Sequence, residues 1–290
     1  MTDVRSNNSP AAAITGAGAG LGRQIALSLA EQGYRVFGTA LSAQEVEDLW
    51  QVSDGSVRLA IVDVTDDQAV HSWAEQTTGE LGEHGLDVLI SNAGILTPGP
   101  LEVLPLDAIR HEFEVNVFGS LAVINAFLPA LRRAQGRIVQ IGSATGKFPL
   151  PFNGPSSASK AALEAFADVY RAELKPFGVH FVIVEPGNMA TGGPAATAHA
   201  LQETGESMTA EQRALYGDAF AAFSATFNSM QSGGLDVATA AARVIQVAQQ
   251  EPAPIRVAIG SDAEELMKAV HEQSDEELDA LRMQVAGLGT

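Results

Sequence analysis

The sequence contains no cysteine among its 290 residues. Disulfide bonds, thiolate nucleophiles and cysteine metal ligands are therefore excluded. Basic residues are also scarce, because 17 lysines and arginines stand against 35 aspartates and glutamates and give a formal net charge of −18. A negative field of this size repels phosphate backbones and anionic lipid, so we expect neither a nucleic acid nor a membrane surface as a partner.

Long hydrophobic runs and metal-ligand patterns are also missing. No run approaches about 18 consecutive apolar residues, so no segment is expected to span a membrane. Residues 1–10 are polar and lack the apolar core of a signal peptide, so we expect a short disordered leader on a cytoplasmic protein. The histidines show no metal-ligand spacing, which predicts no metal centre; they are His71, His84, His111, His180, His199 and His271.

The chain does contain a regular alternation of short apolar runs and longer amphipathic segments. This alternation is typical of βαβ units, in which helices join parallel strands. Apolar runs predict strands at residues 11–15, 34–40, 57–62, 87–91, 137–141, 180–185 and 255–259. Helical spacing predicts helices at residues 21–32, 66–78, 106–114, 115–133, 155–177 and 237–249.

These elements predict a single α/β domain over residues 11–290. Its fold class is a doubly wound parallel sheet of about seven strands with helices on both faces. Residues 188–234 are rich in alanine, glycine, threonine and serine, and we interpret them as a substrate lid. Residues 262–284 predict one acidic terminal helix.

A glycine-rich turn follows the first strand. Residues 15–22 read Thr-Gly-Ala-Gly-Ala-Gly-Leu-Gly and lead directly into a helix. Small residues let backbone N–H groups approach a pyrophosphate, and the positive N-terminal end of the helix stabilises the phosphate charge. The pattern therefore predicts a dinucleotide site; the alternative is a tight strand-to-helix turn that binds nothing.

The spacing Thr-Gly-x-x-x-Gly-x-Gly resembles the fingerprint of the short-chain dehydrogenase/reductase family. Members of this family are oxidoreductases with a Rossmann-type fold, and the resemblance implies that this chain binds NAD(P)(H). The turn would contact the cofactor through Thr15, Gly16, Gly20, Leu21 and Gly22.

Further cofactor motifs follow in the family's order along the chain. Asp63 and Val64 resemble the pair that holds the adenine. The segment after the fourth strand resembles the family's Asn-Asn-Ala-Gly and supplies Asn92, Ala93 and Gly94, with Ser91 for the first asparagine. The segment that caps the nicotinamide is matched by Pro186, Gly187 and Thr191.

The resemblance also assigns catalytic positions. Asn116 matches the helix asparagine that holds a proton-relay water, and Ser143 matches the serine that orients the substrate. Each residue has a local structural alternative as well: Asn116 could cap a helix junction, and Ser143 could bond the backbone at a strand end. Asp63 could likewise begin a turn.

The main departure from the family lies at its Tyr-x-x-x-Lys pair. Residues 156–160 read Ser-Ser-Ala-Ser-Lys, so Lys160 is present and Ser156 stands in the tyrosine position. In the family the lysine binds the cofactor ribose and lowers the pKa of the phenol, which then exchanges a proton with the substrate oxygen. A serine hydroxyl is shorter and much less acidic, so it cannot take over this role.

The second departure concerns the choice of cofactor. An acidic residue after the second strand would accept the ribose hydroxyls of NAD, and an arginine there would bind the 2′-phosphate of NADP. Residues 38–42 read Gly-Thr-Ala-Leu-Ser and contain neither. The preference between NAD and NADP therefore stays open.

Four functions are compatible with these features. The first is NAD(P)-dependent oxidation or reduction of a medium-sized apolar alcohol or carbonyl, slowed or altered by Ser156, with a water in the place of the phenol. The second is non-redox catalysis, such as cyclisation, dehydration or isomerisation, and the third is a binding pseudo-enzyme. The fourth is an ordinary reductase in which the tyrosine was replaced by design. By resemblance, helices 116–133 and 155–177 would form a homodimer or homotetramer interface.

Overall fold

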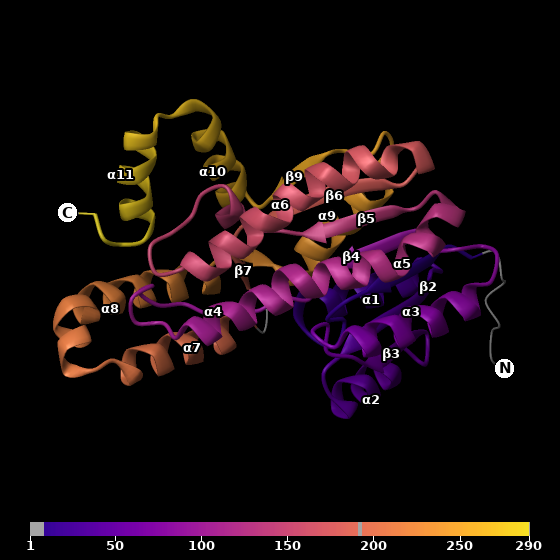
Figure 1. The fold of residues 1–290 in the computed structure, drawn as a ribbon, viewed down its shortest axis with the longest axis horizontal. Coiled ribbons are helices and arrows are strands. Elements are labelled where there is room, and N and C mark those ends of the chain that lie inside the picture. The colour runs from indigo at the N-terminus through magenta and orange to yellow at the C-terminus, as the bar shows by residue number, and fades with distance from the viewer. Residues whose placement is uncertain (1–8, 191–192, 290) are drawn as a thin grey trace.

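The central sheet consists of seven parallel strands. The computed structural model describes residues 9–190 and 193–289, so most of the expected leader lies outside the described residues. The strands are β1 (Ala11–Ile14), β2 (Arg35–Ala40), β3 (Val57–Ile61), β4 (Val88–Ser91), β5 (Arg137–Ile141), β6 (His180–Pro186) and β9 (Arg256–Ile259). Their order across the sheet is β3-β2-β1-β4-β5-β6-β9 (Figure 1), which confirms the predicted fold class.

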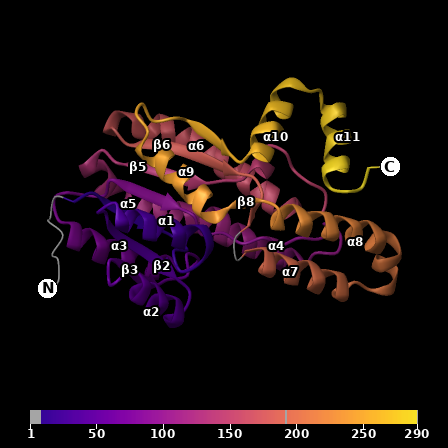
Figure 2. The ribbon, with the colours of Figure 1, turned by 180° about the vertical axis from the view of Figure 1, so that it is seen from behind.

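Helices cover both faces of this sheet (Figures 1 and 2). On one face α1 (Gly20–Glu31) packs against α9 (Val237–Gln249). The other face carries α3 (Asp67–Leu81), α5 (Ser120–Ala134) and α6 (Gly154–Leu174). The inner strands β1, β4, β5 and β6 are buried on both faces and need continuous apolar sequence, which explains why they were recognisable from their apolar runs; the edge strands β3 and β9 are only partly buried.

The first strand illustrates the alternation between the two cores. All four residues of β1 are fully buried. Ala12 and Ile14 belong to the core under α1 and α9, whereas Ala11 and Ala13 belong to the core under α3 and α5. Successive side chains of a strand point to opposite faces, so β1 contributes to both cores.

A helix that the sequence did not predict follows β2. It is α2 (Ala43–Val52), and it begins with a capping box in which Ser42 Oγ accepts a hydrogen bond from Glu45 N while the Glu45 side chain accepts one from Ser42 N. Only Leu49 of this helix is fully buried. The sequence does contain signals for this helix, because Ser42 and Glu45 have capping-box spacing and Val46, Leu49 and Trp50 recur at helical spacing.

The two helices predicted at 106–114 and 115–133 form one continuous helical stretch. It consists of α4 (Leu106–Phe113), the π-helical turn η1 (Glu114–Gly119) and α5. By length and composition alone, this stretch is the one candidate membrane span among the described residues. Half of its most apolar window is buried, and α5 contacts β4 and α3. We therefore interpret it as a helix that packs against the central sheet.

The segments that follow β6 are more ordered than the sequence suggested. The predicted lid contains β7 (Met189–Ala190), α7 (Gly193–Ser207) and α8 (Ala210–Ser232), and β8 (Leu235–Asp236) follows directly after it and pairs with β7. The single terminal helix predicted at 262–284 is corrected to two, α10 (Ser261–Glu272) and α11 (Asp275–Val285). The break arises because Ser274 and Glu277 form a capping box that starts a new helix.

Ion pairs at one edge of the sheet fix the position of α6. Glu164 on α6 is 3% exposed and lies 2.8 Å from both Lys147 Nζ and Arg256 Nη1. Arg256 on β9 also contacts the fully buried Glu185 on β6. Burial raises the pKa of Glu185, and the hydrogen bond from Arg256 opposes this shift.

We predict that Phe127→Ala destabilises the fold strongly. Phe127 is fully buried on α5, and its ring meets Trp73 edge-on with a centroid distance of 4.8 Å. Loss of the ring should lower the free energy of unfolding by about 3–5 kcal/mol, because it leaves a cavity between α5 and the sheet. Urea denaturation measures this loss. The matched control Leu215→Ala removes a 65% exposed side chain and should change stability by less than about 0.5 kcal/mol. A loss below about 1 kcal/mol for Phe127→Ala would contradict the assigned core.

Candidate active site

Two adjoining cavities lie at the carboxyl ends of the central strands. One has a volume of about 250 Å³ and borders the glycine-rich turn; we call it the nucleotide pocket. The other, of about 560 Å³, extends from Lys160 to the lid, and we call it the reaction pocket. Gly94 and Ile95 line both. From β1 the chain adds β2 and β3 on one side of the sheet, and from β4 it adds the remaining strands on the other side. The connections at the carboxyl ends of β1 and β4 therefore diverge and leave a crevice, and the two pockets lie there.

The glycine-rich turn has the geometry that close approach of a diphosphate requires. Gly16 and Gly20 have φ values of +64° and +54°, in the left-handed region that favours glycine. A Cβ on Gly22 would lie 2.3 Å from Gly16 O, so no larger residue fits there. The N-cap Ala19 has no side-chain hydrogen bond to α1, so the first N–H groups of α1 keep their capacity to bind an anion.

Thr15 and Asn92 brace this turn from behind. Thr15 Oγ1 accepts hydrogen bonds from Asn92 N and Ala93 N, each at 2.9 Å. Asn92 Nδ2 donates to Thr15 O at 2.9 Å and to Gly16 O at 3.3 Å. Thr15 is 1% exposed, so it positions the loop and does not line either cavity.

The outer wall of the nucleotide pocket combines apolar and acidic side chains. Asp63 and Val64 line it, as the resemblance implied for an adenine site. Asp63 also forms the local turn that was its alternative interpretation, because its Oδ1 accepts hydrogen bonds from Thr65 N and Thr65 Oγ1. Glu45 of α2 lines the same pocket and was not foreseen from the sequence.

A buried polar network lies beside Lys160. Asn116 is fully buried in the π-helical turn η1, and its Nδ2 donates to Ser159 Oγ at 3.0 Å and to Glu112 Oε1 at 3.3 Å. Glu112 is also fully buried, and its Oε2 accepts from Thr97 N at 2.8 Å. Lys160 Nζ donates to Ile141 O at 3.0 Å. Sequence reasoning missed Glu112, because nothing in the sequence shows that it points inward.

Burial moves the pKa values of two neighbouring groups, Glu112 and Lys160, toward neutral pH. It raises the pKa of Glu112 to about 6, and the hydrogen bonds from Thr97 and the charge of Lys160 oppose this shift. It lowers the pKa of Lys160 to about 8, and the Glu112 charge opposes that shift. A carboxyl and an amine that both titrate near pH 7 can exchange protons at a functional site.

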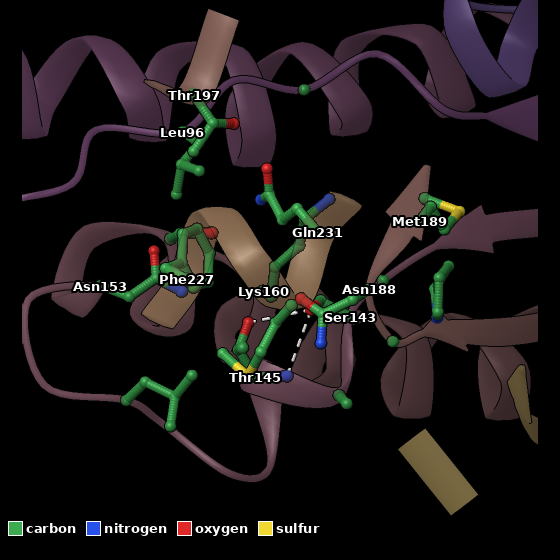
Figure 3. A pocket seen from close by; sticks show the side chains of 18 of the residues that line it. Leu96, Ser143, Thr145, Asn153, Lys160, Asn188, Met189, Thr197, Phe227 and Gln231 are labelled. Carbon is green, nitrogen blue, oxygen red and sulfur yellow. Dashed lines mark hydrogen bonds between the residues drawn. The ribbon is translucent and has the colours of Figure 1, made fainter. Parts of the chain in front are cut away.

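Hydroxyl groups line the reaction pocket together with Lys160, and Figure 3 shows those of Ser143 and Thr145 beside the lysine. Ser143 follows β5, and its Oγ accepts hydrogen bonds from Thr145 N at 3.2 Å and Thr145 Oγ1 at 2.9 Å. Ser156 lies in the first turn of α6, is 8% exposed and lines the same pocket as Lys160. The structure therefore brings Ser143, Ser156 and Lys160 together.

No tyrosine of the described chain lines the reaction pocket. Tyr170 OH donates to Asn125 Oδ1 at 2.8 Å, and its ring stacks on Phe181. Tyr216 OH donates to Glu102 Oε2 at 2.5 Å on the surface of the lid. Tyr34 precedes β2, at the opposite ends of the strands.

The inner wall of the reaction pocket includes the segment after β6. Pro186 and Gly187 line it, whereas Thr191 lies outside the described residues. Asp262 at the start of α10 holds this segment, because its Oδ2 accepts hydrogen bonds from Asn188 N and Asn188 Nδ2. The terminal helices therefore contribute to the pocket, which the sequence did not indicate.

The end of the pocket under the lid is mainly apolar. Two polar side chains stand out there, because Asn153 Oδ1 and Gln231 Oε1 are buried and have no hydrogen-bond partner among the residues that the structure describes. The apolar side chains around them are Leu96, Leu150, Phe227, Met230, Leu266 and Val285. Such a cavity fits an apolar molecule with a few polar groups.

The predicted site residues separate into three groups in the structure. Those lining the reaction pocket are Leu21, Asn92, Gly94, Ser143, Ser156, Lys160, Pro186 and Gly187. Those lining the nucleotide pocket are Gly16, Asp63, Val64, Ala93 and, again, Gly94. Those lining neither cavity are Thr15, Gly20, Gly22 and Asn116. Within residues 9–190 and 193–289, no cluster of three or more acidic or histidine side chains could hold a metal ion.

Comparison with known proteins assigns the family. The family model described as short chain dehydrogenase matches residues 10–202, about two thirds of the chain. The chain belongs to the short-chain dehydrogenase family. A solved short-chain dehydrogenase from Streptomyces avermitilis superposes with a TM-score of 0.76 at 27% identity, over 96% of both chains.

Two further relatives of this short-chain dehydrogenase are informative. Retinol dehydrogenase 5 of Mus musculus is 36% identical over 212 residues, which are 71% of this chain and 66% of that protein. The alignment therefore spans just under two thirds of the relative's own length. A short-chain dehydrogenase from Burkholderia cenocepacia J2315, solved in complex with NADP, has a TM-score of 0.71 at 25% identity and covers 96% of this chain and 98% of that chain.

We predict that Glu112→Gln lowers the pKa of Lys160 below its present value of about 8. The substitution removes the negative charge that favours the protonated lysine and leaves burial unopposed. The chain has only four lysines, so the Cε resonances in ¹³C NMR spectra can follow the titration of each. The control Glu114→Gln removes an exposed carboxylate from the same helical stretch and should leave the Lys160 titration unchanged. An unchanged or higher Lys160 pKa in Glu112→Gln would contradict the coupling.

Proposed function

We propose that this short-chain dehydrogenase is an NAD(P)-dependent oxidoreductase of medium-sized apolar alcohols or carbonyls. We further propose that Ser156 occupies the position of the family's catalytic tyrosine. The observation that carries both statements is that Ser156 and Lys160, one helical turn apart on α6, line one pocket with Ser143. The apolar lining under the lid and the relationship to a retinol dehydrogenase support an apolar substrate.

The residues at the crevice fit a dinucleotide. The turn at residues 16–22 offers the close backbone approach and the uncapped helix N-terminus that a diphosphate needs. The reaction pocket begins at Gly94 and Ile95, where the nucleotide pocket ends, so a nicotinamide would lie beside Pro186, Gly187 and Lys160. A bound NAD(P) supplies the hydride acceptor or donor.

Side chains of the reaction pocket would transfer the proton to or from the substrate oxygen. In our proposal the ammonium of Lys160, oriented by its bond to Ile141 O, is the proton donor nearest to the substrate. A water between Ser143 and Ser156 would connect the lysine to the substrate oxygen in place of a phenol. Asn116 and Glu112 hold α6 and the lysine in position through Ser159. Loss of a well-placed catalytic acid typically costs about 10²–10⁴-fold in rate, so the unmodified protein should be slow with ordinary ketones.

A non-redox reaction on the same scaffold is the second candidate. It is favoured by the space beside Ser156 and by the buried unpartnered oxygens of Asn153 and Gln231, which can hold a polar substrate group without hydride transfer. This candidate and a pure binding protein share the prediction that restoring the phenol brings no gain in carbonyl reduction.

We predict that Ser156→Tyr raises NAD(P)H-dependent carbonyl reduction by about 10²–10⁴-fold. The phenol would stand one turn from Lys160 and restore a proton donor of suitable acidity. The assay follows NADH and NADPH absorbance with a panel of apolar ketones and aldehydes. The matched control Ser156→Phe has the same bulk without the hydroxyl and should show no gain. No increase for Ser156→Tyr with any carbonyl, in a variant that still binds the dinucleotide, would refute the redox proposal.

We also propose that the protein forms a homodimer or homotetramer through its helical layer. Phe118 on η1 and Phe166 and Val169 on α6 are 52%, 41% and 53% exposed, and these two elements pack against each other. Exposed apolar side chains gathered on neighbouring helices are typical of an interface.

We predict that Phe166→Glu lowers the oligomer mass measured by size-exclusion chromatography with light scattering. A carboxylate in the buried centre of an interface is costly, so subunits should separate into monomers. Leu215→Glu on α8, a position 65% exposed on the lid, is the control and should keep the mass of the unmodified protein. A monomeric unmodified protein would refute this interface.

A further inference from the structure

We infer that Glu45 makes the nucleotide pocket selective for NAD(H) over NADP(H). The inference rests on the proposed binding of a dinucleotide and assigns the cofactor specificity of that same site. The sequence left this preference open because residues 38–42 contain neither an acidic residue nor an arginine. The fold supplies the missing charge from the first turn of α2.

The Glu45 side chain turns back from the helix toward the end of β2. Its Oε2 accepts hydrogen bonds from Leu41 N at 2.9 Å and from Ser42 N at 3.2 Å. These two N–H groups lie just before α2, where the positive end of the helix favours an anion, so they are natural donors for a phosphate. Glu45 already occupies them.

The same carboxylate lies against the glycine-rich turn. A Cβ on Gly18 would be 2.8 Å from Glu45 Cδ and 3.0 Å from Glu45 Oε2, so the Glu45 side chain packs directly against the turn. Glu45 therefore lines the nucleotide pocket between the turn and the end of β2, together with Thr39 and Leu41. In a dinucleotide fold the adenosine ribose lies between these two segments.

The other charges of the pocket reinforce this effect. Asp63 is the second acidic residue in the lining of the nucleotide pocket. The described lining residues include one histidine, His111, and neither lysine nor arginine. A ribose 2′-hydroxyl can donate a hydrogen bond to a carboxylate. A 2′-phosphate is an acceptor with about two negative charges, and it would meet the Glu45 carboxylate and the N–H donors that Glu45 already occupies. The pocket consequently favours the cofactor without the phosphate, although the Burkholderia relative was solved with NADP.

The first test is a fluorescence titration of the unmodified protein with NADH and NADPH. We expect the Kd for NADPH to exceed that for NADH by about 10- to 100-fold, as expected for like charges separated by a few ångströms near a protein surface. Binding is measured without a substrate, so the result does not depend on Ser156 or on turnover. Equal or tighter binding of NADPH overturns this inference and leaves the proposed function intact. Failure to bind either dinucleotide overturns both.

The second test is Glu45→Gln, which removes the charge and keeps an oxygen that can accept from Leu41 N. We expect the Kd for NADPH to fall by about tenfold while the Kd for NADH changes by less than about threefold. The matched control is Glu47→Gln, which makes the same change of net charge on an exposed residue outside the pocket lining and should leave both Kd values unchanged. An unchanged NADPH/NADH ratio in a Glu45→Gln protein with normal circular dichroism overturns the role of Glu45.

Discussion

The hydrogen bonds that join the end of β1 to the end of β4 are the constraint on which the site depends. Thr15 Oγ1 accepts from the backbone N–H groups of both Asn92 and Ala93, so one buried hydroxyl ties the two strands together where their crossovers diverge. In addition, Asn92 Nδ2 donates a hydrogen bond to the carbonyl oxygen of Gly16. The glycine-rich turn therefore cannot move independently of the segment after β4. This segment includes Gly94 and Ile95, which line both pockets.

The second constraint is the polar interior below α6. Glu112, Asn116 and Ser159 satisfy one another away from water, and a buried network of this kind is stable only because its members are paired. The π-helical turn η1 places Asn116 in this interior. Glu164 and Arg256 fix the outer side of the same helix to the sheet. The helix α6, which carries Lys160, is thus fixed on one side by the buried hydrogen bonds of Ser159 and on the other by the ion pair of Glu164.

The sequence predicted the fold well because burial of the inner strands on both faces leaves a direct mark in composition. The seven strands were recognisable as apolar runs, and Ser143, Ser156 and Lys160 do line one pocket. The missed features share a different origin. Glu112 and Asn153 are polar residues whose environment is created by distant segments, and no local pattern distinguishes them from solvent-exposed residues. Glu45 differs, because Ser42 and Glu45 have the Ser-x-x-Glu spacing of a capping box, and only the contact with the glycine-rich turn depends on the fold. The break at Ser274 was missed because acidic residues on both sides continue a helical pattern across it.

The last part of the chain closes the reaction pocket. Asp262, Leu266 and Val285 line it, although the nucleotide pocket is complete by Val115. The apolar end of the reaction pocket is thus built partly by the last 30 or so residues, whereas the glycine-rich turn and the end of β2 come from the first half of the chain. Changes at Leu266 or Val285 can reshape the apolar end without altering the nucleotide pocket. Asp262 differs from these two residues, because it also holds the segment that follows Gly187.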